Sequence, residues 1–399
     1  MKRKIFLFLI TGLLVSSCEI FQPQSPTPES FFVKFFGGSG EQEGVSIQIL
    51  NEETIYVFGY TNSVNNTNQL HLINMDKAGN ERWVKTLDGG GSTAVDLKLT
   101  ESQTDLILLS DVVTASGLKT RLTKTDLDGT IIWDKTLNTQ NGVSYAASRI
   151  STITGTTNFL VVGTEMNPAG QNGNLVTRIY VSELDTDGNF VWEKTYSFTD
   201  RKAEYGVDVQ ALNGNVVVLG RSVALNGRER PILIEANRTS IGEELQSEIL
   251  FESNTDLPSI LRAKEMLLTT NNEFIVLCSD NTNVGILKVL VSSEDRITPE
   301  LPNFLTINMS PLRFTQTQNN DLLITGVVNQ KIGLMRVNSQ GVNVWNAIQE
   351  FGTGRVNINN VGRQVAENAD GSILTVGTID FFDKKMIGVI KATAEGKLE

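Results

Sequence analysis

Short apolar runs recur along the chain, and each ends in a small residue. The small residues are Gly59, Ser110, Gly163, Gly220, Cys278, Gly326 and Gly377, and successive ones lie 48 to 58 positions apart. The runs are nearly continuous in Val, Ile, Leu and aromatic residues, as in 56–59 and 217–220. Such runs are typical of strands buried on both faces. Their even spacing indicates an internal repeat of about fifty residues.

Further strands surround each buried run. An alternating apolar and polar segment precedes it, as in residues 45–49 and 95–99, which predicts a strand with one apolar face. A third strand, a turn and a fourth strand follow it, as in residues 70–75 and 82–87. Four antiparallel strands in every repeat describe the blade of a β-propeller. We therefore expect an all-β, seven-bladed β-propeller.

The turn between the third and fourth strands has a recurring pattern. An Asp or Asn is followed three residues later by a glycine and then, four residues after that, by a tryptophan. All four tryptophans occupy this position: Trp83, Trp133, Trp192 and Trp345. The Asp or Asn side chain opens such a turn, glycine supplies its left-handed conformation, and we expect the indole to pack between adjacent blades. Blades four and five lack the tryptophan, and Leu245 and Phe304 are expected to replace it.

The two ends of the repeat region complement each other. The seventh unit, residues 361–399, supplies three strands and no fourth. Residues 31–40 resemble the fourth strand of the first unit, residues 83–91. We expect this amino-terminal strand to complete the last blade, which would leave no exposed blade edge. The propeller is therefore expected to occupy residues 31–399.

The first thirty residues have the features of an export signal and a tether. Three basic residues precede an apolar run of about eleven residues, whereas a membrane-spanning helix needs roughly 20, so residues 1–17 are expected to be a cleaved signal peptide. The residues ending at Cys18 resemble the lipobox of bacterial lipoproteins. This resemblance implies that Cys18 is acylated, for example with palmitate, and anchors the mature chain to a membrane. Residues 18–30 contain three prolines and are expected to form the tether.

Charge and rare residues limit the functions that the chain can perform. Its net charge is −11, and loss of residues 1–17 would make it −14, so nucleic acid and anionic lipid head groups are not expected partners. His71 is the only histidine, which argues against histidine-rich metal clusters and Ser-His-Asp catalysis. If Cys18 is acylated, Cys278 has no disulfide partner and is expected to be a buried, inert thiol.

The units resemble the degenerate repeats of bacterial propeller lipoproteins, which are common among the Bacteroidota, and more distantly the quinoprotein-type propeller repeat. The resemblance covers residues 31–399 and implies an outer-membrane lipoprotein on the periplasmic face or at the cell surface. Quinoprotein sites gather calcium ligands and a vicinal disulfide, but this chain has no adjacent cysteines, and no cofactor is expected. The paired aspartates of the turns at 126–129 and 185–188 could bind calcium, but no later bidentate glutamate follows them, which favours simple hairpin turns.

A ligand site in such a ring is expected at the mouth of the central channel. Polar residues on the innermost strands are Asp96, Asp208, Lys264, Arg313 and Arg363, and their mixed charge is also what a water-filled channel would show. We expect a non-catalytic binding or scaffold module for a protein or glycan. Two alternatives stay open. One is a glycan-cleaving enzyme, which would need two carboxylates about 5 to 9.5 Å apart, and the other is a purely structural surface-layer component.

Overall fold

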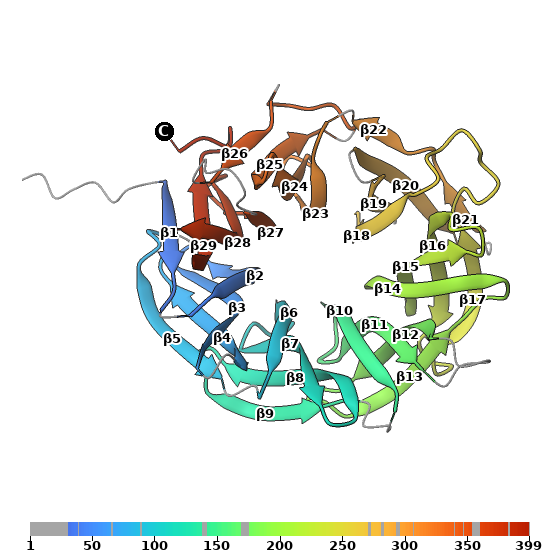
Figure 1. Cartoon of the computed structure of the whole chain (residues 1–399), viewed down its shortest axis with the longest axis horizontal. Helices are drawn as coiled ribbons and strands as arrows, with labels where there is room; N and C mark the ends of the chain where they lie inside the picture. Colours follow the sequence, from blue (N-terminus) through green and yellow to red (C-terminus); the bar gives the residue numbers. More distant parts are fainter. Residues whose placement is uncertain are drawn as a thin grey trace, which may run out of the picture.

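The computed structural model shows seven antiparallel sheets arranged in a ring around a central axis (Figure 1). It describes residues 31–398 apart from 39, 65–66, 88–89, 138–141, 169–174, 270–272, 281–282, 293–295, 306, 339, 346, 353–359 and 382–383. The predicted all-β, seven-bladed propeller is confirmed. In the described part of the chain, no helix is long and apolar enough to cross a membrane.

Six blades place their strands in chain order from the centre of the ring outwards, and in the last blade β1 (Phe32–Phe36) lies outermost, beside β29. The innermost strands are β2 (Gln42–Asn51), β6 (Ser92–Leu99), β10 (Ser144–Thr152), β14 (Arg201–Leu212), β18 (Arg262–Leu268), β23 (Ser310–Gln316) and β27 (Val361–Glu367). The second strands are β3 (Thr54–Val64), β7 (Asp105–Thr114), β11 (Phe159–Asn167), β15 (Asn215–Ala224), β19 (Glu273–Ser279), β24 (Leu322–Val328) and β28 (Ile373–Phe381).

The third and outermost strands complete the blades. The third strands are β4 (Thr67–Met75), β8 (Gly117–Asp126), β12 (Val176–Leu184), β16 (Glu229–Asn237), β20 (Val284–Ser292), β25 (Lys331–Val337) and β29 (Lys384–Ala392). The outermost strands are β5 (Glu81–Leu87), β9 (Ile131–Thr136), β13 (Phe190–Tyr196), β17 (Glu243–Ile249) and β26 (Gln349–Phe351). In the fifth blade two short strands, β21 (Arg296–Pro299) and β22 (Asn303–Leu305), both pair with β20.

The amino-terminal strand β1 (Phe32–Phe36) closes the ring as predicted. It pairs antiparallel with β29, with Phe32 opposite Lys391 and Phe36 opposite Ile387. Phe32 and Phe36 are 5% and 6% exposed and join the apolar cluster between the last blade and the first. The two ends of the described chain therefore belong to one sheet.

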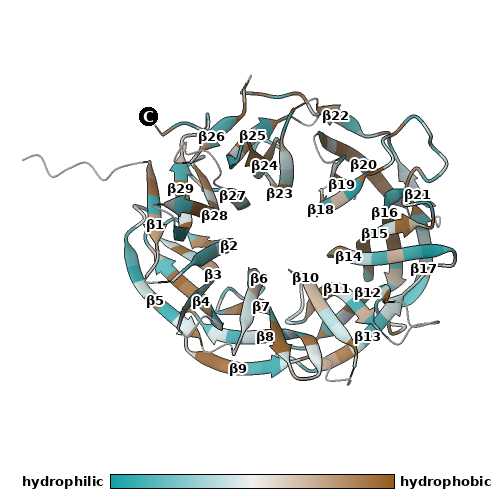
Figure 2. Cartoon of the chain, in the orientation of Figure 1, coloured by the Kyte–Doolittle hydropathy of each residue, from teal (hydrophilic) through white to brown (hydrophobic). Residues whose placement is uncertain are grey.

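The core lies between the blades. One apolar cluster occupies each junction between consecutive blades, built mainly from the second and third strands, whose side chains are buried on both faces. Outer strands such as β5 and β17 are mainly hydrophilic (Figure 2). Because each blade buries its apolar faces against its two neighbours, a chain of this length needs no second domain.

The turn glycines and the tryptophans meet across the blade junctions. The glycines of the four predicted turns have φ values between 73° and 76°. A Cβ atom on Gly129 would lie 2.9 Å from the Trp83 ring of the preceding blade, and one on Gly188 would lie 2.8 Å from Trp133. Phe32 of β1 takes the same place in the last blade, against Gly79 of the first blade. The predicted packing of the indoles between blades is confirmed.

Three details of this prediction are wrong. Trp345 packs on the next blade but precedes β26 instead of lying within it. Leu245 is 45% exposed, and Gln246 takes the tryptophan position opposite Glu235. The hairpin of the fourth blade is one residue pair longer than that of the first, because Asn237 also pairs with Glu243. In the fifth blade Asn303, not Phe304, lies against the turn glycine of the following blade.

Replacing Gly188 by alanine should destabilise the protein more than replacing Gly155 by alanine. Both glycines have positive φ, 73° and 77°, so both variants carry the backbone cost of about 1–2 kcal/mol. Only Gly188 has an indole against it, whereas a Cβ on Gly155 meets nothing within 4 Å. Overpacking should add about 1–3 kcal/mol at Gly188, measurable by urea unfolding. Equal losses in the two variants would show that the indole contact is not tight.

Candidate functional site

Each innermost strand contains a β-bulge near its start, and the residue directly after the bulge is polar in every blade. These seven residues, which we call the floor layer, are Ser46, Asp96, Arg149, Asp208, Glu265, Arg313 and Gln364. A bulge inserts one unpaired residue and redirects the side chains beside it. The same irregularity in every blade therefore brings one polar side chain per blade to the same level of the channel.

The small residues of the sequence repeat are explained by these bulges. Each one pairs with the residue that precedes the bulge. A Cβ atom on Gly59 would lie 2.1 Å from the carbonyl oxygen of Glu43, and similar overlaps of 2.1 to 2.3 Å arise at Gly163, Gly326 and Gly377. The neighbouring backbone comes too close for a side chain at these four glycines. The repeat signal in the sequence thus marks the place where each blade directs a polar residue into the channel.

Asp96 is the centre of one half of the floor layer. Its carboxylate is fully buried and accepts a hydrogen bond of 2.9 Å from Arg313 Nη1, although Arg313 belongs to the sixth blade and Asp96 to the second. The Ser46 hydroxyl lies 3.1 Å from Asp96 Oδ1 and 2.6 Å from Gln364 Oε1. Burial alone would raise the pKa of Asp96, but the guanidinium groups of Arg313 and Arg149 outweigh it and hold the pKa well below its ordinary value.

Arg149 organises the other half. It lies on the third blade and forms an ion pair of 3.0 Å with Glu265 of the fifth blade. Its Nε atom lies 3.9 Å from Asp208 Oδ1 on the fourth blade between them. Burial raises the pKa of Asp208, the Glu265 carboxylate adds to this, and Arg149 opposes both. These two groups of residues place three carboxylates and two guanidinium groups in one buried layer.

The floor layer also joins neighbouring blades through backbone hydrogen bonds. Five of its side chains accept a backbone N–H of the following blade. The pairs are Ser46 with Leu97 (3.2 Å), Asp96 with Ile150 (3.4 Å), Asp208 with Met266 (2.9 Å), Glu265 with Phe314 (2.6 Å) and Gln364 with Ile47 (3.0 Å). The other two floor positions hold the arginines. The layer therefore ties successive blades together at the channel.

The expectation that these residues line a water-filled channel is wrong at this level. Asp96, Asp208 and Arg313 are 0%, 1% and 9% exposed, and Arg313 reaches residues on other blades. The gap at the centre of the ribbon drawing is crossed here by side chains (Figure 1). Hydrogen bonds between blades hold these polar groups, so their role in the described structure is to assemble the ring.

A cavity of about 580 Å³ lies at the channel mouth, bounded below by Arg149 and Arg313 of the floor layer. All seven bulge residues line it: Val45, Val95, Ser148, Val207, Lys264, Leu312 and Arg363. Its volume falls in the range of small-molecule sites, about 300–1,000 Å³. Because each bulge directly precedes a residue of the floor layer, the wall of this cavity is built by the fold itself and comes from all seven blades.

Positive side chains dominate this cavity. Arg221, Lys264 and Arg363 line it above the floor, and among the described residues that line it Glu43 is the only carboxylate. Glu43 lies 3.4 Å from Arg363 Nη2 and 3.0 Å from Lys385 Nζ. Burial would raise the pKa of Glu43, but Lys385, the Tyr60 hydroxyl and Arg363 lower it overall. The chain as a whole carries a charge of −11, so the cavity differs in sign from the rest of the molecule.

The structure divides the residues predicted for the channel mouth between two levels. Asp96, Asp208 and Arg313 belong to the floor layer, whereas Lys264 and Arg363 are bulge residues on the wall of the cavity. Sequence reasoning missed four floor residues: Ser46, Arg149, Glu265 and Gln364. A signal for them existed, because each lies about a dozen positions before the small residue of its repeat.

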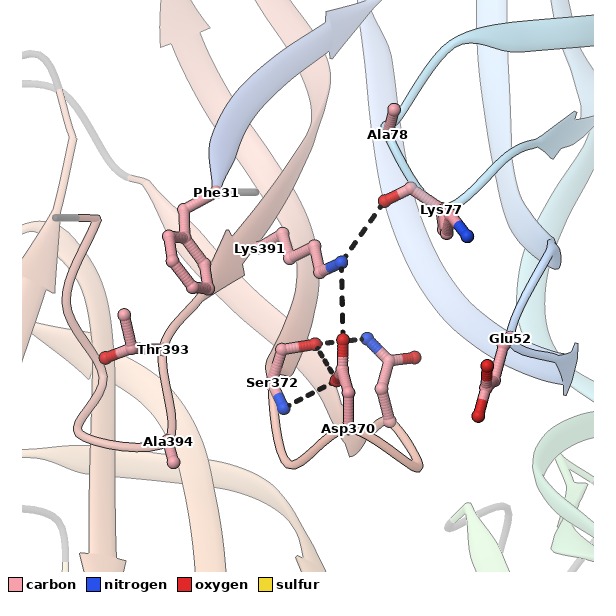
Figure 3. A pocket seen from close by; sticks show the side chains of 10 residues that line it. Phe31, Glu52, Lys77, Ala78, Asp370, Ser372, Lys391, Thr393 and Ala394 are labelled. Atoms are coloured by element: carbon pink, nitrogen blue, oxygen red, sulfur yellow. Dashed lines mark hydrogen bonds and ion pairs between the residues drawn. The ribbon is translucent and has the colours of Figure 1, made fainter. Parts of the chain in front are cut away.

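A second cavity, of about 410 Å³, lies at the seam where the last blade meets the first (Figure 3). Phe31 and Lys391 line it together with Lys77 of the first blade. Lys391 Nζ donates to the Lys77 carbonyl at 3.3 Å and lies 3.8 Å from Asp370. These contacts reinforce the closure of the ring, and the cavity adjoins the point where the chain enters β1.

The Asp-Gly turns use their carboxylates internally. Asp126 Oδ1 accepts the backbone N–H groups of Asp128 and Thr130, and Asp185 makes the equivalent bonds in its own turn. Among the described residues, no group of three or more His, Cys, Asp or Glu side chains is placed to hold a metal ion. These hydrogen bonds show that Asp126 and Asp185 stabilise their own hairpin turns, as predicted.

Cys278 and His71 are the two remaining residues that the sequence singled out, and both are at least partly buried. Cys278 is fully buried beside the bulge of its blade, and burial raises the pKa of its thiol. His71 is partly buried on β4, with Nδ1 3.3 Å from the Thr86 hydroxyl, and burial lowers its pKa. A buried thiol with a raised pKa is a poor nucleophile.

The stability of the protein should fall as the pH rises from about 4 to about 7. Burial raises the pKa of both Asp111 and Glu204 to about 7. One backbone hydrogen bond opposes this shift at each group, and the charges of Arg201 and Arg178 also oppose it at Glu204. A carboxyl group whose folded pKa is raised stabilises the fold fully below its unfolded pKa of about 4, and this contribution is lost as the pH rises through the folded pKa. Thermal unfolding at pH 5 and pH 8 measures the difference.

The variants Asp111→Asn and Glu204→Gln provide the control for this prediction. They remove two of the titrating carboxyl groups and should make the decline between pH 5 and pH 8 shallower, while Asp208, whose pKa burial raises to about 6, still contributes. Asp134→Asn, on the outer strand β9, should leave the slope unchanged. A wild-type slope that survives in the double variant would assign the pH dependence to other groups.

Comparisons with known proteins show the fold alone. No family model matches the chain, and no curated protein matches it. Hydrazine synthase from Kuenenia stuttgartiensis aligns with a TM-score of 0.53 at 10% identity, covering 89% of this chain and 96% of that one. A protein from Lactobacillus plantarum aligns with a TM-score of 0.51 at 9% identity, covering 77% and 84%.

A third similar structure is a protein of unknown function from Bacteroides caccae. It has a TM-score of 0.42 at 10% identity and covers 90% of this chain and 92% of that one. At such low sequence identities the similarity shows the arrangement of the blades and gives no function, because propellers serve many unrelated functions. Function has to be argued from the cavity and its residues.

Proposed function

We propose that this protein is a lipid-anchored propeller that binds a protein or glycan at the cell envelope without chemically changing it. The observation that carries the proposal is the cavity at the channel mouth. Its wall consists of one bulge residue from each of the seven blades, and the buried floor layer holds that wall in place. A preformed, rigid cavity binds with little loss of conformational entropy.

The polar groups of this cavity support binding over glycan hydrolysis. Hydrolysis by paired carboxylates needs two acidic groups facing one pocket. Of the described residues that line the cavity, Glu43 alone is acidic, and it is engaged by Arg363 and Lys385. Asp208 and Glu265 lie close together below, but backbone N–H groups and Arg149 already occupy their oxygens.

The proposed anchor explains how such a module would be held. Cys18 and residues 1–30 lie outside the described residues, but β1 begins only fourteen positions after Cys18 and forms the seam of the ring. A tether of this length would keep the seam near the outer membrane, at its periplasmic face or on the cell surface. The blades across the ring from the seam, which carry β14 and β18, would then lie farthest from the lipid (Figure 1).

Replacing Cys18 by serine should abolish membrane anchoring. The acyl chains need the thiol, and each buried methylene contributes about 0.8 kcal/mol to membrane binding. Fractionation of cells that express the variant should show unprocessed precursor or released protein, and mass spectrometry should show no acyl groups. The control is Ser17→Ala, which keeps the Cys18 thiol. Unchanged membrane association of Cys18→Ser would contradict the anchor.

The binding role is tested by affinity capture from detergent-solubilised native membranes, followed by mass spectrometry of proteins and glycans. Leu312→Trp would fill the cavity from a bulge position that belongs to none of the apolar clusters between blades, whereas Ile132→Trp alters an exposed site on β9. We expect a partner on the wild-type protein and on Ile132→Trp, but not on Leu312→Trp. No partner on any of the three would instead favour a structural surface-layer component.

A further inference from the structure

Three cations meet where the fourth and fifth blades form the wall of the channel mouth. Arg221 lies near the end of β15, and Arg262 and Lys264 lie at the start of β18. A single carboxylate lies among them: Glu229 Oε1 is 3.0 Å from Arg221 Nη1, and its Oε2 is 2.8 Å from Arg262 Nε. The two arginines thus share the Glu229 carboxylate, and the cluster has a net charge of +2.

Lys264 is the cation of this cluster that lacks a partner. Within the part of the chain that the structure describes, its ammonium group makes no hydrogen bond and no ion pair. It is partly buried, and it lines the cavity. Burial lowers its pKa, and the positive charges of Arg221 and Arg262 lower it further. An anion beside the ammonium group would relieve both effects.

Arg221 is held ready for such an anion. Its guanidinium lies over the Tyr205 ring, 4.8 Å from the ring centroid, and Glu229 fixes one end of it. Stacking and an ion pair restrict a side chain that would otherwise lose entropy on binding. The cluster therefore combines a fixed guanidinium with an unpaired ammonium group on one side of a cavity.

We propose that the cavity at the channel mouth binds a sugar-sized organic anion whose carboxylate or phosphate group contacts Lys264 and Arg221. The inference rests on the proposed binding function and specifies its ligand. A volume of about 580 Å³ suits a small molecule or the end of a chain. The wall mixes polar side chains such as Ser148 with apolar ones such as Val95 and Leu312, which suits a sugar, because a sugar ring has C–H faces as well as hydroxyl groups. Acidic and phosphorylated saccharides share this oxyanion chemistry, and the choice of probes separates them.

The test is isothermal titration calorimetry on the full chain in detergent micelles. The probes are digalacturonate, glucose 6-phosphate, inorganic phosphate and neutral maltose. We expect at least one of the two sugar anions to bind and maltose to give no heat of binding. The affinity for the anion should fall as salt is added. Lys264→Gln should weaken binding at least tenfold. Lys98→Gln is the matched control, because Lys98 lines a separate cavity with Gln48 and Gln364, away from the mouth.

The outcomes are distinct. Binding of digalacturonate alone assigns a carboxylate, and binding of glucose 6-phosphate alone assigns a phosphate ester. Binding of neither sugar anion, or equal losses in Lys264→Gln and Lys98→Gln, overturns the inference. Inorganic phosphate that binds without either sugar anion also overturns it. A partner that Lys264→Gln still captures from membranes would keep the proposed function while rejecting this ligand.

Discussion

Replacing Asp96 by asparagine should lower the free energy of unfolding by about 3–5 kcal/mol, the range found when one partner of a buried ion pair is removed. Asp96 is fully buried, and its Oδ1 accepts from Arg313 while its Oδ2 accepts the Ile150 N–H. An asparagine keeps the size but replaces one acceptor by a donor and leaves the Arg313 charge uncompensated. Urea unfolding monitored by tryptophan fluorescence measures the loss.

An exposed ion pair provides the comparison. Lys331 and Glu350 lie 3.0 Å apart with side chains about one-third exposed, so Glu350→Gln should cost less than about 1 kcal/mol. The double variant Asp96→Leu/Arg313→Met should recover much of the stability, because it removes both charges together. A loss below about 1 kcal/mol for Asp96→Asn would show that the floor layer does not hold the blades.

The pH dependence of this variant has a definite sign. Arg313 and Arg149 hold the pKa of Asp96 below its ordinary value despite burial, so its contribution to stability is present above pH 4. It is lost as the pH falls through the folded pKa. The difference between wild-type protein and Asp96→Asn should therefore be largest near neutral pH and should shrink in acid.

The blades could be predicted from the sequence because their signals are local. The small residue at the end of each apolar run reflects the close backbone at the bulge, as at Gly59, where a Cβ atom would overlap the Glu43 carbonyl. The turn glycines reflect positive φ, and the tryptophans reflect contact with the following turn. Each signal depends on strands of one blade or of two adjacent blades, so a repeating pattern reveals it.

The floor layer could be predicted only in part, because its contacts depend on how the ring closes. Arg313 and Asp96 lie 217 positions apart and meet only when the first and last blades are already in place between them. The alternation of apolar and polar residues shows that Arg313 and Asp96 lie on innermost strands. It does not show where the β-bulge falls in each strand or which residues the two side chains contact. The same limit explains why Arg149 and Glu265 were missed, since their ion pair spans a whole blade.

The position of Gln246 illustrates a different limit. Its hairpin contains one residue pair more between the bulge and the turn than the hairpin of the first blade, which places the tryptophan-equivalent position at Gln246 and not at Leu245. Hairpin length is weakly encoded when the Asp-Gly pattern degenerates, as at residues 237–242. The strands themselves stay in register, because both faces of β16 are buried.

Removing β1 should have the largest effect of any change to the chain. A chain that begins at residue 37 lacks the five residues that pair with β29, and it loses the buried rings of Phe32 and Phe36. Each of these side chains contributes about 1.5–3 kcal/mol through burial, so we expect a loss of about 3–6 kcal/mol before the broken hydrogen bonds are included. A chain that begins at residue 30 keeps the closure and is the matched control.

The truncated chain should also associate with itself. Without β1, the edge of β29 presents unpaired N–H and C=O groups, and such an edge pairs readily with another chain. Size-exclusion chromatography should show oligomers of the chain that begins at residue 37 and a monomer of the longer control. A synthetic peptide of residues 30–37 should restore both the monomer and the melting temperature, because it supplies the missing strand in trans. A truncated chain that stays monomeric and melts within a few degrees of the control would show that the seam is held by Lys391 and the apolar junction without this strand.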